Sequence, residues 1–285
     1  MTRVTSSSHI VVAGVGYVGK RMLAAVCSGN ATGLSRSCPA ESNCLQLDLD
    51  TGLFPDLPAH DDVGVVYTIP PSADSESDER LVRFLDWLES PPARFVYIST
   101  TGVYGDAGGA LVNEQFVAAP QNARSKRRLA AEKTLEAWRD RTGSRLVVLR
   151  CPAIYGPGRL GLERIRAAAP VISEAEADPG NRIHVDDLVR CCIAGLDDSV
   201  QSGTYNVGDG DHRSATWFSH TVADLAGLPR APEITRDDAT SLFSPERLSY
   251  LNESRRLDNA KMLGELLPEL AYPNPADGIR ASLPD

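Results

Sequence analysis

Three glycines near the N-terminus have a spacing that suits phosphate binding by backbone amides. They lie in a G-x-G-x-x-G pattern made of Gly14, Val15, Gly16, Tyr17, Val18 and Gly19. The pattern directly follows an apolar run at residues 10–13 and opens a segment of helical spacing. In that context the glycines permit a tight turn, and the N–H groups at the helix start approach a pyrophosphate. The pattern predicts a dinucleotide site.

The residues after the second apolar run bear on which dinucleotide would bind. An NAD-selective site usually has Asp or Glu there, whereas this run ends in Ser35 and Arg36. A guanidinium and a hydroxyl suit a 2′-phosphate, so NADP(H) is favoured, with NAD(H) as the alternative. A solvated loop arginine is the other interpretation of Arg36. Asp48, after the third run, is placed to accept from the adenine amino group or to start a turn.

Composition excludes several function classes. The chain has 285 residues, is 42% hydrophobic and carries a net charge of -9, so it has no general basic field for nucleic acid. No apolar run approaches the ~18 residues that a membrane span needs. Residues 1–8 are polar and resemble no secretory signal, so a cytoplasmic location with reduced thiols is expected. The cysteines lack metal-site spacing, so we expect no metal, and they are interpreted as small buried hydrophobes: Cys27, Cys38, Cys44, Cys151, Cys191 and Cys192.

The alternation of short β-branched runs with helical segments predicts an α/β fold with a doubly wound parallel sheet of the Rossmann type. The expected strands are residues 10–13, 31–34, 44–47, 63–69, 95–99, 146–150 and 204–207. The expected helices are residues 81–88, 122–141, 185–196, 214–226 and 258–267. Residues 1–155 are expected to form the cofactor domain, with the sheet completed by about 183–208. Residues 156–182 and 209–285 would form a smaller, discontinuous C-terminal substrate lobe.

Five segments together resemble the extended and atypical branches of the short-chain dehydrogenase/reductase superfamily, the NAD(P)-dependent epimerase/dehydratase-like group. They are AGVGYVG at 13–19, FVYISTTGVYG at 95–105, LRCPAIYGPGR at 149–159, RIHVDDL at 182–188 and GTYNVG at 203–208. The resemblance implies hydride transfer assisted by a Ser or Thr and by a Y-x-x-x-K pair. Residues i and i+4 are neighbours on a helix, so the lysine lowers the phenol pKa for proton exchange.

The match to this catalytic set is incomplete. Thr100 matches the Ser/Thr that polarises the substrate oxygen, and Lys126 matches the lysine that holds the nicotinamide ribose. Asn122 stands where the family has its tyrosine, and its expected role is to cap the following helix. Three alternatives remain open: another proton donor, changed chemistry, or cofactor binding without turnover. The candidate donors are water, Tyr104, Tyr155 and His184.

The resemblance also assigns residues around the two ligands. The further cofactor residues that it implies are Ile69, Pro70, Pro71, Ser99, Pro152 and Ile154. The substrate residues are Thr101, Arg124, Tyr155, Arg159 and His184. Both arginines would receive an anionic group or else be solvated, and His184 would line the cleft or be structural. The expected substrate is a small polar or nucleotide-linked metabolite. Family members often dimerise through the helix that carries Lys126, which leaves a homodimer open, and a catalytically silent sensor or scaffold is the rival function.

Overall fold

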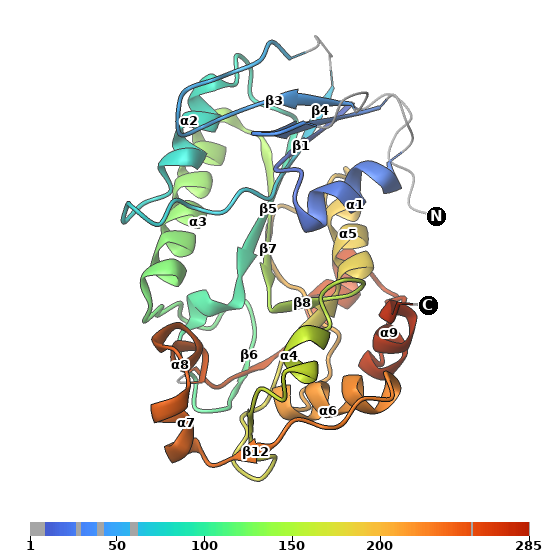
Figure 1. Cartoon of the computed structure of the whole chain (residues 1–285). Helices are drawn as coiled ribbons and strands as arrows, with labels where there is room; N and C mark the ends of the chain where they lie inside the picture. The colour runs from blue at the N-terminus through green and yellow to red at the C-terminus, as the bar shows by residue number, and fades with distance from the viewer. Residues whose placement is uncertain (1–8, 27–29, 39–42, 58–61, 252, 285) are drawn as a thin grey trace.

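A seven-stranded parallel sheet forms the centre of the molecule in the computed structural model, which describes residues 9–26, 30–38, 43–57, 62–251 and 253–284. Its strands lie in the order β11-β7-β5-β4-β1-β2-β3 (Figure 1). Their bounds are β1 His9–Ala13, β2 Ala31–Ser35, β3 Cys44–Gln46, β4 Val63–Tyr67, β5 Arg94–Thr100, β7 Arg145–Cys151 and β11 Gly203–Asn206. The prediction of a doubly wound Rossmann sheet is confirmed.

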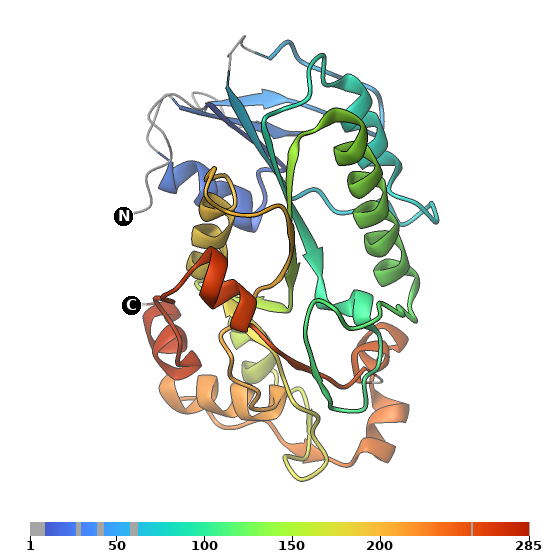
Figure 2. The ribbon, with the colours of Figure 1, turned by 180° about the vertical axis from the view of Figure 1, so that it is seen from behind.

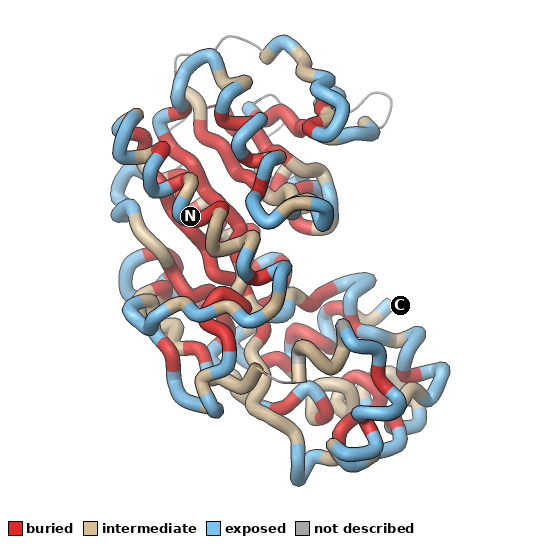
Figure 3. The backbone as a smooth tube through the Cα atoms, turned by 90° about the vertical axis from the view of Figure 1, so that its left-hand side faces the viewer, coloured by how far each residue is buried: buried red, intermediate tan, exposed pale blue. Residues whose placement is uncertain are grey.

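Helices cover both faces of the sheet. On one face lie α1 (Tyr17–Ala25) and α5 (Val185–Ala194), and on the other lie α2 (Glu79–Trp87) and α3 (Ala123–Thr142) (Figure 1). Alternate strand residues therefore enter two separate cores, one below each helix layer. The burial map shows the strands as a continuous buried band between these layers (Figure 3).

Local capping fixes where the covering helices begin. Asp78 accepts a hydrogen bond from the Leu81 N–H at the start of α2, and Asn122 accepts one from the Ser125 N–H at the start of α3. Gly143 ends α3 in the left-handed conformation. The predicted capping role of Asn122 is thus confirmed.

Smaller elements lie beyond the carboxyl ends of the sheet strands (Figures 1 and 2). Their helices are η1 Thr101–Tyr104, α4 Leu162–Arg166, α6 Ala215–Leu225, α7 Arg236–Leu242, α8 Pro245–Leu251 and α9 Pro275–Ser282. The π-helical turn η2 (Met262–Leu266) lies apart from these helices, beside β11 and α5, where Lys261 donates to the Thr204 carbonyl and Cys191 contacts Met262. The smaller strands pair as β8 Ala153–Tyr155 with β10 Arg182–His184, β9 Val171–Ile172 with β12 Glu233–Ile234, and β6 Leu111–Val112 with β13 Arg256–Leu257. The proposed division into two lobes stays a prediction.

Two expected elements differ from the structure. The strand expected at 63–69 ends at Tyr67, which pairs with Ala13, the last residue of β1. The helix expected at 258–267 is wrong at its start, since Asp258 continues the pairing of β13 through its N–H to the Val112 carbonyl. Within the described ranges, no helix has the length and apolar character needed to cross a bilayer. The expectation for residues 1–8 lies outside the described residues.

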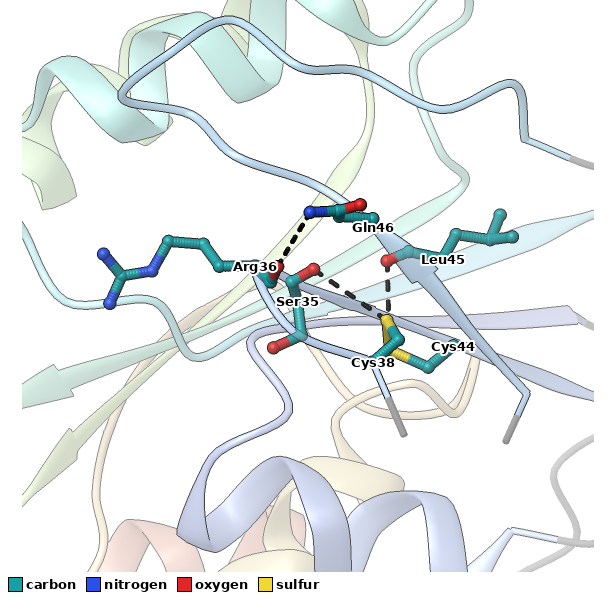
Figure 4. Close-up of a disulfide and its surroundings, with 6 residues drawn as sticks. All are labelled: Ser35, Arg36, Cys38, Cys44, Leu45 and Gln46. Carbon is teal, nitrogen blue, oxygen red and sulfur yellow. Dashed lines mark hydrogen bonds between the residues drawn. A yellow bond between two sulfur atoms is a disulfide. The ribbon is translucent and has the colours of Figure 1, made fainter. Parts of the chain in front are cut away.

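The cysteine interpretation needs one correction. Cys38 and Cys44 are joined in a disulfide, so they are neither free thiols nor simple core hydrophobes (Figure 4). The end of β2 and the start of β3 bring the two Cα atoms to 5.5 Å, a separation that the local spacing of residues did not reveal. Buried free thiols are confirmed for Cys151, Cys191 and Cys192, while Cys27 lies outside the described residues.

Candidate functional site

The glycine turn between β1 and α1 has the shape that close approach of a diphosphate requires. Gly14 has φ +100°, and a Cβ on Gly19 would overlap the Gly14 carbonyl oxygen, so neither position accepts a side chain. Gly16 is different, because a Cβ there would meet nothing within 4 Å. The turn is therefore packed tightly on the protein side and open at Gly16. The residues present fit a dinucleotide.

Tyr17, inside that turn, points toward the loop after β8. Its hydroxyl donates to the Pro157 carbonyl at 3.1 Å, and its ring lies between two guanidinium groups. The Arg21 group is 4.2 Å and the Arg159 group 4.0 Å from the ring centroid. Arg159, predicted to clamp a substrate anion, thus lies beside the glycine turn. Val18 of the same turn packs into the core.

The loop after β2 presents Arg36 to solvent. The Arg36 side chain is 72% exposed, and its guanidinium lies 4.0 Å from the Asp50 carboxylate. The Gln46 side-chain amide donates to the Arg36 carbonyl at 3.1 Å (Figure 4). The adjoining disulfide and the hydrogen bond from the Leu47 N–H to the Ser35 carbonyl tie the same loop to β3. The Arg36 backbone is held while its side chain stays accessible.

Arg80 of α2 joins the loops after β3 and β4. It donates to both oxygens of Asp50 and, at 3.2 Å, to the Pro70 carbonyl. The hydrogen bond from Arg80 holds the pKa of Asp50 below its ordinary value. Asp48 accepts a hydrogen bond from the Asp50 N–H at 3.0 Å, which is the turn-forming role considered for it. Ile69 and Pro71 are half-buried in the adjoining loop.

The end of β5 meets the start of α3. Thr100 is half-buried, and its hydroxyl accepts a hydrogen bond from the Gly102 N–H at 3.2 Å. A Cβ on Gly102 would overlap Ser125, so α3 packs closely on this turn. Lys126, the next residue, is exposed, whereas Thr101 is buried.

Asn122 is held on both sides of its amide. Its oxygen caps α3, and its Nδ2 donates to Glu253 Oε1 at 2.8 Å. Arg255 donates to the other oxygen of Glu253 at 3.1 Å and to the Gly105 carbonyl at 2.6 Å. The Glu253 side chain is 5% exposed. Asn122, the position at which the resemblance predicts a tyrosine, therefore belongs to a buried polar cluster, and Glu253 and Arg255 were missed in the sequence.

A second buried network underlies the predicted catalytic residues. Ser99 donates to Glu132 of α3, and Glu132 pairs with Arg150 of β7 at 2.7 Å. The Arg150 guanidinium lies 4.7 Å from the Tyr104 ring centroid, and the Tyr104 hydroxyl donates to Asn206 at 2.6 Å. Burial raises the pKa of Tyr104. Ser99 and Tyr104 thus have partners inside the protein.

The remaining predicted substrate residues divide by exposure. His184 is buried, caps α5 through the Asp186 N–H, and lies 3.0 Å from the Ser282 hydroxyl. Burial lowers the pKa of His184, which favours its neutral form. Tyr155 is buried beside His184, with ring centroids 5.2 Å apart. Arg124 is exposed at the start of α3. The two predicted cofactor residues Pro152 and Ile154 are half-buried next to Tyr155.

A cavity of about 540 Å³ lies where the loop after η1 meets α7, α8 and the segment at 178–179. It is lined by Asp106, Gly108, Gly109, Asp178, Pro179, Arg236, Leu251 and Ser254. Ser254 follows Glu253 directly, so the cavity adjoins the cluster around Asn122. Among the residues that the structure describes, no group of His, Cys, Asp or Glu could hold a metal ion.

Comparison with known proteins identifies similar chains. Residues 79–208 match the model of the NAD dependent epimerase/dehydratase family. The chain is 25% identical over 260 residues to the GDP-6-deoxy-D-mannose reductase of Pseudomonas aeruginosa, covering 81% of this chain and 84% of that protein. A functionally unknown conserved protein from Silicibacter pomeroyi has a similar structure, with TM-score 0.80, 27% identity and coverage of 97% and 98% of the two chains. A human epimerase family protein, solved with NADPH, has TM-score 0.72, 16% identity and coverage of 96% and 98%.

Proposed function

We propose that this chain, whose residues 79–208 match the model of the NAD dependent epimerase/dehydratase family, binds a nicotinamide dinucleotide, NADP(H) in preference to NAD(H), and acts on a nucleotide-linked metabolite. The observation that carries the proposal is the glycine turn, closed to side chains at Gly14 and Gly19 and open at Gly16. Backbone amides at such a turn bind a diphosphate.

The preference for NADP(H) rests on the loop after β2. The described part of that loop holds no carboxylate to accept from a ribose 2′-hydroxyl, whereas Arg36 is accessible and charged. A 2′-phosphate would compete with Asp50 for this guanidinium, and a charge-assisted hydrogen bond to phosphate is stronger than a contact at 4.0 Å. A structural relative from human, which has the same fold, was solved with NADPH.

The chemistry proposed for the site is reduction, epimerisation or dehydration. A bound nicotinamide supplies or accepts a hydride. Thr100 would polarise the substrate oxygen through its hydroxyl, and Lys126 would hold the nicotinamide ribose, since both are accessible where β5 meets α3. An amide cannot exchange a proton as a phenol does, so Asn122 takes no part as acid or base. Tyr104 is the proposed alternative donor, and it could act only if its hydroxyl left its present acceptor, Asn206.

The substrate class is inferred from the similarity to a named relative and from the volume of a cavity. The relative in Pseudomonas aeruginosa is named for a nucleotide sugar, and the cavity beside Ser254 has a volume within the range of small-molecule sites. Arg124 is the exposed cation nearest in sequence to Asn122 and would contact an anionic substrate group. A cytoplasmic location and a homodimer are further expectations that belong to this proposal.

Calorimetric titration with NADPH and NADH, for the natural chain and for Arg36→Ala, tests the proposal. We expect the natural chain to bind NADPH more tightly, and Arg36→Ala to lose affinity for NADPH alone. Arg230→Ala is the matched control, because Arg230 is an exposed, ion-paired arginine on a different element. Equal affinity for both dinucleotides would remove the 2′-phosphate argument, and no binding of either would remove the proposed function.

A catalytically silent sensor or scaffold is the second candidate, favoured by the cluster that ties Asn122 to Glu253. It predicts tight dinucleotide binding without any substrate-dependent change at the absorbance band of reduced nicotinamide. This absorbance is measured with a panel of nucleotide sugars and simple carbonyl compounds as possible substrates. One substrate with robust turnover excludes the sensor.

A further inference from the structure

The loop after β8 is fastened to the glycine turn through one aromatic ring. The Tyr17 hydroxyl donates to the Pro157 carbonyl, and Arg21 donates to the same carbonyl at 3.3 Å. The Arg159 guanidinium lies on the Tyr17 ring, 4.0 Å from its centroid. Gly156 permits this approach, because a Cβ there would come within 2.8 Å of the Tyr17 hydroxyl. A residue far along the chain thus lies beside Gly16.

The two cations on Tyr17 differ in how they are neutralised. Arg21 lies 3.8 Å from the Asp186 carboxylate and also donates to the Tyr17 carbonyl at 3.3 Å. Arg159 is exposed, and its guanidinium lies on the Tyr17 ring. No carboxylate of the described residues forms an ion pair with it. A guanidinium on an aromatic face is oriented but keeps all its N–H donors, so it can bind a phosphate in a bidentate manner.

We propose that Arg159 binds the diphosphate of the dinucleotide, with Tyr17 as the platform that orients it. The inference rests on the proposed function and assigns Arg159 to the cofactor, whereas the sequence predicted a substrate contact. A diphosphate also occurs in nucleotide-linked substrates. The cofactor is favoured because Tyr17 lies between Gly16 and Gly19 in the turn that fits the dinucleotide.

The role predicts a specific pattern of affinities. Arg159→Ala removes one charge-assisted contact, so NADPH should bind about tenfold more weakly. Adenosine 2′-monophosphate carries the 2′-phosphate but neither phosphate of the diphosphate, and its affinity should change less than about twofold. Arg159→Lys keeps the charge without the planar donors, so its affinity for NADPH should lie between those of the natural chain and Arg159→Ala. Tyr17→Leu removes the platform and should weaken NADPH binding by a smaller factor than Arg159→Ala.

Calorimetry of the natural chain and these three variants with NADPH, adenosine 2′-monophosphate and GDP is the experiment. Arg166→Ala is the matched control, since Arg166 is an exposed arginine of the neighbouring α4. Circular dichroism melting checks that each variant is folded, and Arg159→Lys carries the test if the alanine variant is not. The expected result is a loss of affinity for NADPH that adenosine 2′-monophosphate and GDP do not share.

Other outcomes overturn the inference in distinguishable ways. Unchanged NADPH affinity in Arg159→Ala would show that Arg159 makes no contact with the cofactor. An equal loss for adenosine 2′-monophosphate would place its effect elsewhere than on the diphosphate. A loss confined to GDP would assign Arg159 to a nucleotide-linked substrate. Failure of the natural chain to bind either NADPH or NADH would instead refute the proposed function, and the inference with it.

Discussion

Asn122 and Glu253 are joined side chain to side chain, Nδ2 to Oε1 at 2.8 Å, across 131 positions of sequence. The bond ties the start of α3 to the segment between α8 and β13. Because Glu253 is also paired with Arg255, its carboxylate is satisfied inside the protein. Asn122 is therefore a structural junction between these two parts of the chain.

Two substitutions of Asn122 should distinguish the contribution of its helix cap from that of its hydrogen bond to Glu253. Asn122→Ala removes the helix cap and the partner of Glu253, and we expect the free energy of unfolding to fall by about 1–3 kcal/mol. Asn122→Ser keeps a capping oxygen but is too short to bond Glu253, so it should recover part of the loss. Urea unfolding measures both. Equal losses in the two variants would show that capping contributes little.

Thr100 is the residue that we propose polarises the substrate oxygen. Thr100→Val removes the hydroxyl at nearly constant volume, and turnover of a substrate found by screening should fall at least about tenfold. Thr100→Ser keeps the hydroxyl and serves as control, because it can still accept from the Gly102 N–H. A rate unaffected by Thr100→Val removes Thr100 from the mechanism.

The Glu132–Arg150 pair should be important for stability. Both side chains are buried, so Glu132→Gln leaves a buried guanidinium without its counter-charge and should lower the free energy of unfolding by about 3–5 kcal/mol. Glu136→Gln, one turn further along α3 and exposed, should change it by less than about 0.5 kcal/mol. Similar effects in denaturant titrations of the two variants would contradict the assignment.

Asp209 makes stability depend on pH. Burial raises its pKa to about 7, and its Oδ2 has no hydrogen-bond partner among the described residues. The folded state therefore binds a proton that the unfolded state releases near pH 4. The contribution of this proton to the free energy of unfolding is present at low pH and is lost as pH rises toward and through 7. Asp209→Asn keeps the acceptor for the Asp211 N–H at 2.9 Å but cannot ionise.

The measurement for Asp209 is urea unfolding of both proteins from pH 4 to pH 8. The natural chain should lose stability relative to Asp209→Asn over this interval, by about 1.4 kcal/mol for each unit of raised pKa. His184 and His212 titrate in both proteins, so their effects cancel in the difference. If the difference in the free energy of unfolding between the two proteins does not change with pH, the pKa of Asp209 is not raised.

The Cys38–Cys44 disulfide should stabilise the loop that carries Arg36. It closes a short loop, with a sequence separation of 6, for which chain entropy alone gives about 2 kcal/mol. Cys38→Ser should lose that amount, and a dithiol reductant should bring the natural chain to the stability of the variant. The variant itself should not respond to the reductant. Thiol titration that finds Cys38 and Cys44 free in the native protein would contradict the bond.

The sheet could be predicted because its signals are local. Each strand is a short run of apolar and β-branched residues, and the glycine pattern and the Asn122 cap are read over a few positions. The start of the helix expected at 258–267 failed for the same reason, because helical spacing there does not reveal the pairing of β13 with β6.

The site was less predictable because its decisive contacts are distant in sequence. Nothing in the spacing of residues indicates that Glu253 meets Asn122 or that Arg159 lies on Tyr17, 142 positions away. Glu132 could have been noticed, since it shares the inward face of α3 with Ser125 and Leu135. A carboxylate on such a face needs a buried cation, which Arg150 provides.

The pairing of β6 with β13 has a consequence for biosynthesis. The Arg256 side chain bonds the Gly109 carbonyl across 147 positions, so the loop after β5 acquires its partner strand only after that many further residues have been made. At about 5–20 residues per second, the ribosome needs roughly 7–30 s to make that interval. During this time the nascent chain can complete most of its sheet but not the surroundings of Asn122.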